Sequence, residues 1–168
     1  TPINSDRRYR QYKEIHIPSS NAVIMYSRDW SGSVDDRKCE IISDMCWWID
    51  QWIRSFYTKT ERCFFGHDTI CKEVDEDTFY KYRFGGGTTC SSAVKLMSEQ
   101  FTNRFPPDKW NIYCFYFTDG ENWNDDNAAF VESLHQSFPK EVCNLFGLTQ
   151  ILSDDYGSSI KKYCDEHI

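Results

Sequence analysis

The sequence lacks any long apolar run. No stretch approaches the roughly 18 consecutive apolar residues that a membrane-spanning helix needs, and no secretory leader opens the chain. We therefore expect no membrane segment. The first residue is Thr1 rather than Met, from which we expect the chain to be a piece of a longer polypeptide.

Positive charge is also scarce. The chain has 19 Lys and Arg against 26 Asp and Glu, for a formal net charge of −7. Its densest basic stretch, residues 6–10, is short. Nucleic-acid-binding proteins follow phosphates with a basic patch, so we expect no nucleic-acid partner.

The eight cysteines lack the close pairing of metal sites and redox dithiols, since no CxxC or CxxxC is present. Most lie inside apolar runs, where a thiol behaves as a small core side chain. We expect free, mostly buried thiols and a cytoplasmic location. The even count leaves a disulfide framework as the alternative.

Apolar runs and periodic stripes do occur, and they alternate along the chain. We expect strands at 22–26, 62–67, 69–74, 111–117 and 142–148, and helices over 39–56, 93–101, 126–136 and 157–166. Alternation of this kind predicts a three-layer α/β/α fold with a mostly parallel, doubly wound sheet. Residues 1–20 are expected to form an N-terminal arm and residues 21–168 the domain.

Polar side chains gather where three strands are expected to end, which is where doubly wound folds bind ligands. Asp29, Ser31 and Ser33 follow the first strand, Thr88 lies in the Gly-rich loop, and Asp119 follows the strand at 111–117. Two carboxylates and three hydroxyls are the hard oxygen ligands that Mg²⁺ prefers. The alternative is that the serines only cap the following helix.

These five residues resemble the metal-ion-dependent adhesion site of von Willebrand factor A (vWA) domains, with its DxSxS motif, a Thr after two glycines and a later Asp-Gly. The resemblance implies that Ser31, Ser33 and Thr88 coordinate Mg²⁺ or Mn²⁺, while Asp29 and Asp119 act mostly through water. It also implies that a partner protein donates an acidic side chain to the ion. Gly32 is expected to sharpen the turn, and Thr89 is the competing choice for Thr88.

Seven short motifs, in order, resemble the bacterial YeaH/YhbH family: residues 20–23, 66–69, 72–74, 86–88, 91–93, 110–113 and 119–123. Members of this family end in a vWA domain and usually carry a longer N-terminal region. The resemblance implies that residues 21–168 form a vWA-like domain, and it implies a stress or sporulation role linked to a PrkA-type serine kinase.

We therefore expect a non-enzymatic, metal-dependent protein-binding module. The alternative is a Mg²⁺-dependent phosphoryl-transfer or hydrolytic enzyme at the same strand ends. Against it, Ser31 stands where dehalogenase-type phosphatases need a second Asp. The Gly-rich loop also lacks the lysine of a phosphate-binding P-loop.

Two residues beside Asp29 depart from the vWA pattern, which favours small or apolar neighbours. Arg28 is expected either to turn to solvent or to weaken metal binding by its charge. Trp30 is expected to cover the ion or to contribute to a binding surface.

Other polar residues have plainer interpretations. His67 is expected to be a hydrogen-bonded structural residue rather than a ligand or base. Glu121, Asp125 and Asp126 are expected to form a solvated acidic cluster at the start of a helix.

Trp47, Trp48 and Trp52 exceed what the apolar stripe of the first helix can bury. They indicate either a contact surface, for another chain or for a missing N-terminal region, or core packing of an aromatic-rich fold, and the sequence leaves both open.

Overall fold

The computed structural model describes residues 21–82, 86–151 and 159–167, so the expected arm, Gly85 and the expected start of the last helix lie outside it. Five strands form one sheet in the order β3-β2-β1-β4-β5. They are β1 (Asn21–Asp29), β2 (Lys59–His67), β3 (Cys71–Val74), β4 (Asn111–Thr118) and β5 (Leu145–Gln150). All neighbouring pairs are parallel except β2 and β3, which form an antiparallel hairpin. The expected α/β class is confirmed.

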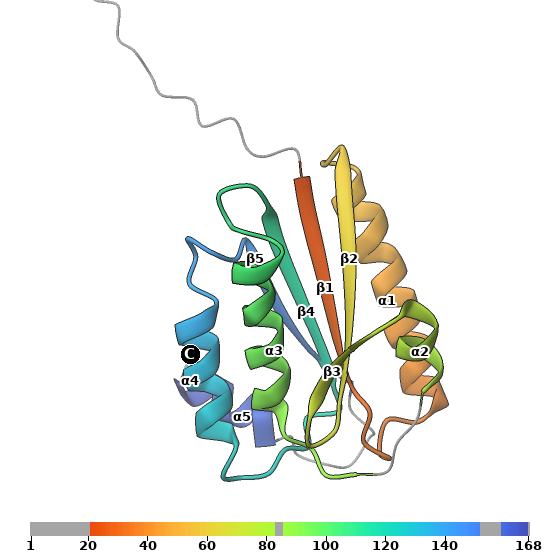
Figure 1. Ribbon diagram of the computed structural model, residues 1–168. Helices are drawn as coiled ribbons and strands as arrows, with labels where there is room; N and C mark the ends of the chain where they lie inside the picture. Colours follow the sequence, from red (N-terminus) through yellow and green to blue (C-terminus); the bar gives the residue numbers. More distant parts are fainter. Residues whose placement is uncertain (1–20, 83–85, 152–158, 168) are drawn as a thin grey trace, which may run out of the picture.

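Helices cover both faces of this sheet (Figure 1). The helices α1 (Asp36–Arg54) and α2 (Glu76–Lys81) pack on one face; α3 (Cys90–Asn103), α4 (Asn127–Ser137) and α5 (Ser159–His167) pack on the other. Side chains of β1 alternate accordingly. Ile24 and Tyr26 join the α1 core, and Val23 and Met25 join the α3 core. Covering on both faces explains why β1 reads as a continuous apolar run.

The long helix α1 begins where the sequence offers a cap. The carboxylate of Asp35 accepts a 2.9 Å hydrogen bond from the Lys38 backbone N–H, which satisfies one of the free N–H groups of the first turn. Within the expected stripe, Cys39, Ile42, Cys46 and Ile53 are buried and Ile49 is half-buried. Phe56, expected as its last member, lies beyond the helix end and is 69% exposed.

Several elements differ from their expected bounds; β1 continues to Asp29, and β3 begins at Cys71. The short helix α2 was not expected, although Asp75 caps it by accepting a 2.8 Å hydrogen bond from the Thr78 N–H. The second strand begins three residues earlier, at Lys59. The last strand begins at Leu145 rather than residue 142, because the preceding N–H groups, including that of Cys143, close a turn on the Pro139 carbonyl.

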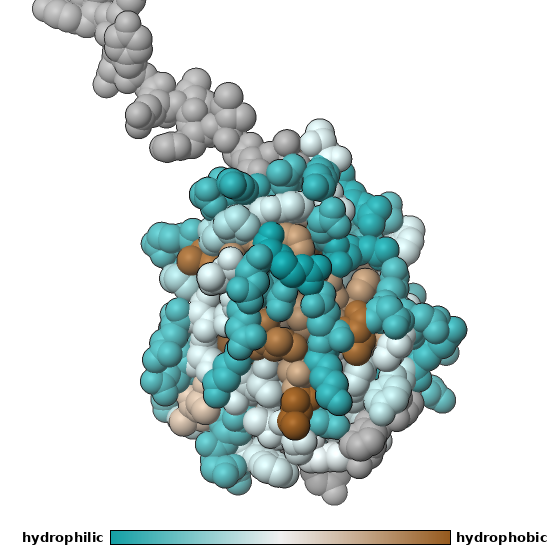
Figure 2. Space-filling view, in the orientation of Figure 1, coloured by the Kyte–Doolittle hydropathy of each residue, from teal (hydrophilic) through white to brown (hydrophobic). Residues whose placement is uncertain are grey.

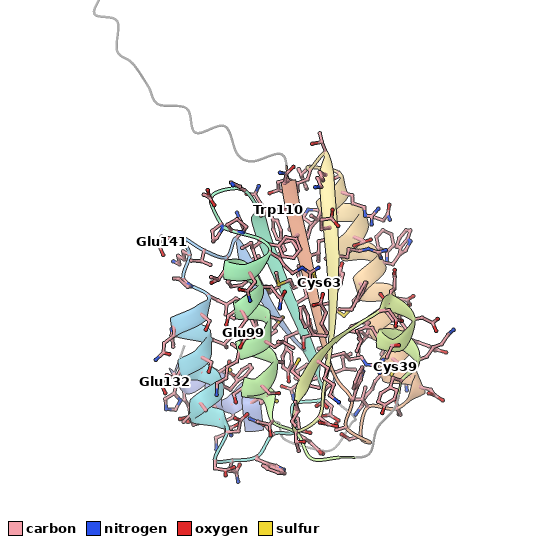
Figure 3. The ribbon with its side chains drawn as sticks, viewed as in Figure 1. Cys39, Cys63, Glu99, Trp110, Glu132 and Glu141 are labelled. Carbon is pink, nitrogen blue, oxygen red and sulfur yellow. The ribbon has the colours of Figure 1, made fainter. Side chains whose placement is uncertain are left out.

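All eight cysteines are free thiols, and six are buried, as expected. Figure 3 places Cys39 near α1 and Cys63 on β2, well apart from each other. Burial raises the pKa of the Cys63 thiol to about 12, which makes it an inert core side chain.

No helix in the described part of the chain is long and apolar enough to cross a membrane. In the view of Figure 2, hydrophobic atoms form separate small patches between hydrophilic side chains.

Candidate functional site

The carboxylate of Asp29 is fully buried at the end of the central strand. Its Oδ1 accepts a 2.7 Å hydrogen bond from the Ser31 N–H, and its Oδ2 accepts a 3.1 Å bond from the Thr118 hydroxyl. Burial raises the pKa of the Asp29 carboxyl, while nearby His67 and the Ser31 N–H oppose the rise. Neighbouring Asp119 raises this pKa further. Asp29 is therefore held in one orientation close to a second carboxylate.

The turn after β1 brings two hydroxyls together. The Oγ atoms of Ser31 and Ser33 lie 3.0 Å apart, and the Val34 N–H donates to the Ser31 carbonyl to close the turn. Gly32 does not adopt a positive φ, and a Cβ built on it would meet no atom within 4 Å. Gly32 was expected to help the turn, but neither a positive φ nor a close approach requires glycine at this position.

A pocket of about 320 Å³ opens beside these hydroxyls. Three segments line it: residues 31–33, 86–88 and 121–123. Thr88 is buried there, whereas Thr89 is not among the lining residues and instead directs its N–H to the Asp68 carbonyl. The structure thus places Thr88, and not Thr89, at the pocket with Ser31 and Ser33.

Asp119, the fifth expected residue, is buried behind this pocket. Its Oδ1 accepts a 3.2 Å hydrogen bond from the Glu121 N–H, and its backbone carbonyl accepts one from Gln150. Gly120, which lies between Asp119 and Glu121 in the chain, has a φ of 89°, a conformation that other residues rarely adopt. The conformation of this glycine therefore turns the chain from β4 toward the pocket.

One charged residue of the site was missed from the sequence. The Nζ of Lys38 donates 2.6 Å to the Ser33 carbonyl and lies 3.3 Å from Oδ2 of Asp119. Its position was visible in the pattern: Lys38 is four residues before Ile42 and therefore lies on the buried face of α1. A cation in the first turn of a helix opposes the helix dipole, which is a second signal.

Arg28 does not turn to solvent; it is 1% exposed. Its guanidinium donates to the backbone carbonyls of Tyr82, at 2.5 Å, and Tyr80, at 3.3 Å, and lies over the Phe79 ring. These contacts fix the end of α2. Arg28 therefore anchors the chain segment that leads to the Gly-rich loop.

Trp30 is buried as well, so it does not form an exposed binding surface. Its ring packs against Tyr82 with centroids 4.6 Å apart, and it lies directly on Gly66 of β2. A Cβ on Gly66 would come within 1.9 Å of the indole. The Trp30 ring therefore fits here because Gly66, on the neighbouring strand β2, has no side chain.

His67 has the structural role expected of it. Its ring stacks on Tyr116, with Nε2 and the Tyr116 hydroxyl 2.7 Å apart, and its Nδ1 lies 3.3 Å from the Asp68 carbonyl. A carbonyl only accepts, so Nδ1 donates and Nε2 accepts from the tyrosine in the neutral ring. Burial lowers the pKa of His67, which favours that neutral form.

The acidic cluster after Asp119 is only partly solvated. Glu121 and Asp125 are exposed, but Asp126 is buried and accepts hydrogen bonds from the Ser91 N–H and hydroxyl. Asn122 accepts a further bond from the Cys90 N–H. The expectation for Asp126 is therefore wrong: this carboxylate fastens the loop that carries residues 121–123 to the start of α3.

The three tryptophans of α1 are at the surface. Trp47, Trp48 and Trp52 are 55%, 67% and 50% exposed, so core packing does not account for them. Trp47 and Trp48 contact each other edge to face, whereas Trp52 contacts Phe56 and also Tyr113 of β4.

The donor set at the pocket suits a hard divalent cation. Within residues 21–82, 86–151 and 159–167, no three His, Cys, Asp or Glu side chains gather as a metal cluster. An ion here would therefore be held by hydroxyl oxygens backed by two carboxylates. That arrangement fits Mg²⁺ or Mn²⁺ and does not suit Zn²⁺.

Comparison with known proteins finds relatives over nearly the whole chain. A family profile described as "Protein of unknown function (DUF444)" matches residues 3–168. The chain is 38% identical over 161 residues to a UPF0229 protein of Ruminiclostridium cellulolyticum, covering 95% of this chain and 40% of that protein. UPF0229 proteins of Bacillus thuringiensis and Bacillus cereus are each 34% identical over 151 residues, covering 89% of this chain and 38% of theirs. The chain thus spans about two fifths of the length of these curated relatives.

Proposed function

Because the chain belongs to the DUF444 family, whose description names no activity, we propose its function from the site: a non-enzymatic protein-binding module that holds one Mg²⁺ or Mn²⁺ ion in the manner of a vWA domain. The UPF0229 relatives correspond to the YeaH/YhbH family that the motifs indicated. The sheet order and the strand-end position of the pocket support the vWA part of the proposal.

One observation carries the proposal: the hydroxyl-bearing residues Ser31, Ser33 and Thr88 line one pocket. The buried carboxylates of Asp29 and Asp119 lie at the ends of β1 and β4 next to it. The two serine Oγ atoms are hydrogen-bonded to each other at 3.0 Å, and this is also the separation of two neighbouring ligands along the edge of an octahedron. Oxygens at about 2.1 Å from Mg²⁺ are neighbours at about 3.0 Å. Capping alone does not explain this pair, since Asp35 caps α1.

The five residues divide into two roles. Ser31, Ser33 and Thr88 supply direct ligands. Both oxygens of Asp29 already accept hydrogen bonds within the protein, so Asp29 orients the turn and acts on the ion through water, as does Asp119. The bound ion supplies a Lewis acid whose open position takes a carboxylate from the partner.

The rim of the pocket provides the remaining contacts. Trp123 is 54% exposed and packs on Gly87, so an aromatic face stands beside the proposed ion. A partner that donates an Asp or Glu would bury this ring on binding, as aromatic residues do at interfaces. From the family resemblance we further propose a PrkA-type serine kinase as that partner and a cytoplasmic stress or sporulation role.

The second candidate is a Mg²⁺-dependent phosphoryl-transfer or hydrolytic enzyme. Glu121 favours it, because this exposed carboxylate lines the pocket and is placed to act as a base. His67 gives it no support, being buried against Tyr116. Hydrolysis of p-nitrophenyl phosphate in Mg²⁺, lost in Ser33→Ala, would establish this candidate over the binding module.

Thermal unfolding tests the ion. At Mg²⁺ or Mn²⁺ concentrations of 100 times Kd, binding adds about 2.7 kcal/mol, which raises Tm by about 5–10 °C for a chain of this size. Ser33→Ala and Thr88→Val should reduce this shift. Ser98→Ala, at a half-buried position of α3 that does not line the pocket, is the matched control and should keep it. An unchanged shift in the site variants would overturn the assignment.

A pull-down tests the partner. The wild-type chain and Ser33→Ala are used as bait in Mg²⁺ and in chelator, with the PrkA-type kinase as prey. Retention only by the wild type in Mg²⁺ supports the proposal. Equal retention of the kinase with and without metal, and by both the wild type and Ser33→Ala, would show that this kinase binds elsewhere.

A further inference from the structure

Lys38 offers an inference that rests on the proposed function and deepens it. We propose that its ammonium is a built-in competitor of the metal: it neutralises the carboxylate site when no ion is bound and must withdraw when an ion enters. Lys38 thereby sets the metal affinity.

Burial of this lysine needs a specific cause. The Lys38 and Asp119 side chains are 9% and 4% exposed, and a buried ammonium is costly unless it is paired. Among the described residues, Nζ contacts two groups of the site: the Ser33 carbonyl at 2.6 Å and Oδ2 of Asp119 at 3.3 Å. The start of α1 gives no favourable field, because a cation there opposes the helix dipole.

Charge balance supplies that cause. The Asp119 carboxylate is close enough to Asp29 to disfavour the ionised form of Asp29. With Lys38 in place, one of the two negative charges is neutralised. A divalent ion neutralises both, and the ammonium at its present position would then be a surplus positive charge facing a cation at short range.

Withdrawal is physically available to this side chain. Ser33, which accepts its hydrogen bond, is only half-buried and lines the open pocket. Lysine has a flexible four-carbon stem and a strongly hydrated head. Rotation about that stem moves the charge toward solvent while the methylenes stay packed on α1.

Mn²⁺ binding measured by electron paramagnetic resonance or calorimetry tests the competition. Lys38→Met keeps the apolar stem and removes the charge, and we expect Mn²⁺ to bind at least about tenfold more tightly. Lys38→Arg should bind no more tightly than wild type. Lys95→Met, which removes the same charge from an exposed position on α3, is the matched control and should leave Kd unchanged.

The outcomes separate the two proposals. Equal or weaker binding by a folded Lys38→Met overturns the competition and makes Lys38 a tether between α1 and the end of β4. Binding by Lys38→Met but not by wild type supports it in its strongest form. No Mn²⁺ binding by any of the chains overturns the proposed function itself.

A measurement on the wild-type chain covers the case in which Lys38→Met does not fold. Reductive methylation with labelled formaldehyde, read by mass spectrometry, reports the accessibility of each lysine. Modification of Lys38 should increase several-fold in Mg²⁺ relative to chelator, while Lys95 stays constant. Equal protection of Lys38 in both conditions would overturn the inference.

Discussion

The Thr118 hydroxyl, at the end of β4, donates a 3.1 Å hydrogen bond to Oδ2 of Asp29, at the end of β1. The same hydroxyl oxygen accepts 3.0 Å from the Gly120 N–H. One side chain thus sets both the orientation of the first carboxylate and the path of the loop that carries Asp119. The site depends on this threonine although it is not itself a candidate ligand.

Thr118→Val should therefore destabilise the protein. The change leaves a buried carboxylate oxygen and a backbone N–H without their partner, at a cost of about 1–3 kcal/mol. Urea unfolding measures the loss. Thr149→Val, the same change in half-buried β5, should cost within about 0.5 kcal/mol. Equal effects of the two changes would contradict a special role for Thr118.

Glycines around the site should respond differently to alanine. Gly66→Ala forces a methyl group against the buried Trp30 ring and should cost about 1–3 kcal/mol. Gly32→Ala meets no atom within 4 Å and should be neutral or stabilising, by up to about 1 kcal/mol. Thermal unfolding of the two variants without metal checks the order. The reverse order would show that the turn, and not Trp30, is the tight point.

Acid should weaken the fold partly through His67. Burial lowers the pKa of His67 in the folded state, so the unfolded chain binds more protons below about pH 6.5. The free energy of unfolding therefore decreases as the pH is lowered. His67→Gln keeps a partner for Tyr116 and should flatten this dependence between about pH 7.5 and about pH 5.5. The slope should change by at most about 1.4 kcal/mol per pH unit. His135→Gln, at an exposed position of α4, should leave it as in wild type, and equal slopes for all three chains would refute this role.

Arg28 should be essential to stability despite its position beside Asp29. Arg28→Met removes charge-assisted bonds to the carbonyls of Tyr80 and Tyr82 and should cost about 2–4 kcal/mol. Arg37→Met, at an exposed position of α1, is the control. Chemical denaturation measures both. A loss no larger than that of the control would mean that these carbonyls find other donors.

Much of the fold could be predicted from the sequence because its signals are local. The runs in β1 and β4 are apolar throughout, as strands covered on both faces must be. The short helix α2 escaped prediction because six residues carry too little periodicity to stand out. The start of β5 was predicted too early because Cys143, although apolar, donates its N–H to the Pro139 carbonyl in a turn before the strand.

The candidate ligands of the site could be predicted from the sequence, but the residues that hold them in place could not. Strand-end oxygens follow from chain order, so Asp29, Ser31 and Asp119 could be grouped before the fold was known. Lys38, Thr118 and Asp126 act across elements, and their partners are set by packing. Only the folded chain shows that Asp126 bonds to Ser91.

The central position of β1 also governs when the site can exist. Asp29 meets Thr118 across 89 residues of chain, and parallel pairs so distant in sequence form slowly because a long loop must close first. During synthesis, the turn after β1 emerges long before β4 does. The pocket and its two carboxylates therefore assemble late in folding, and a nascent chain has no complete site until residues 111–123 have been made.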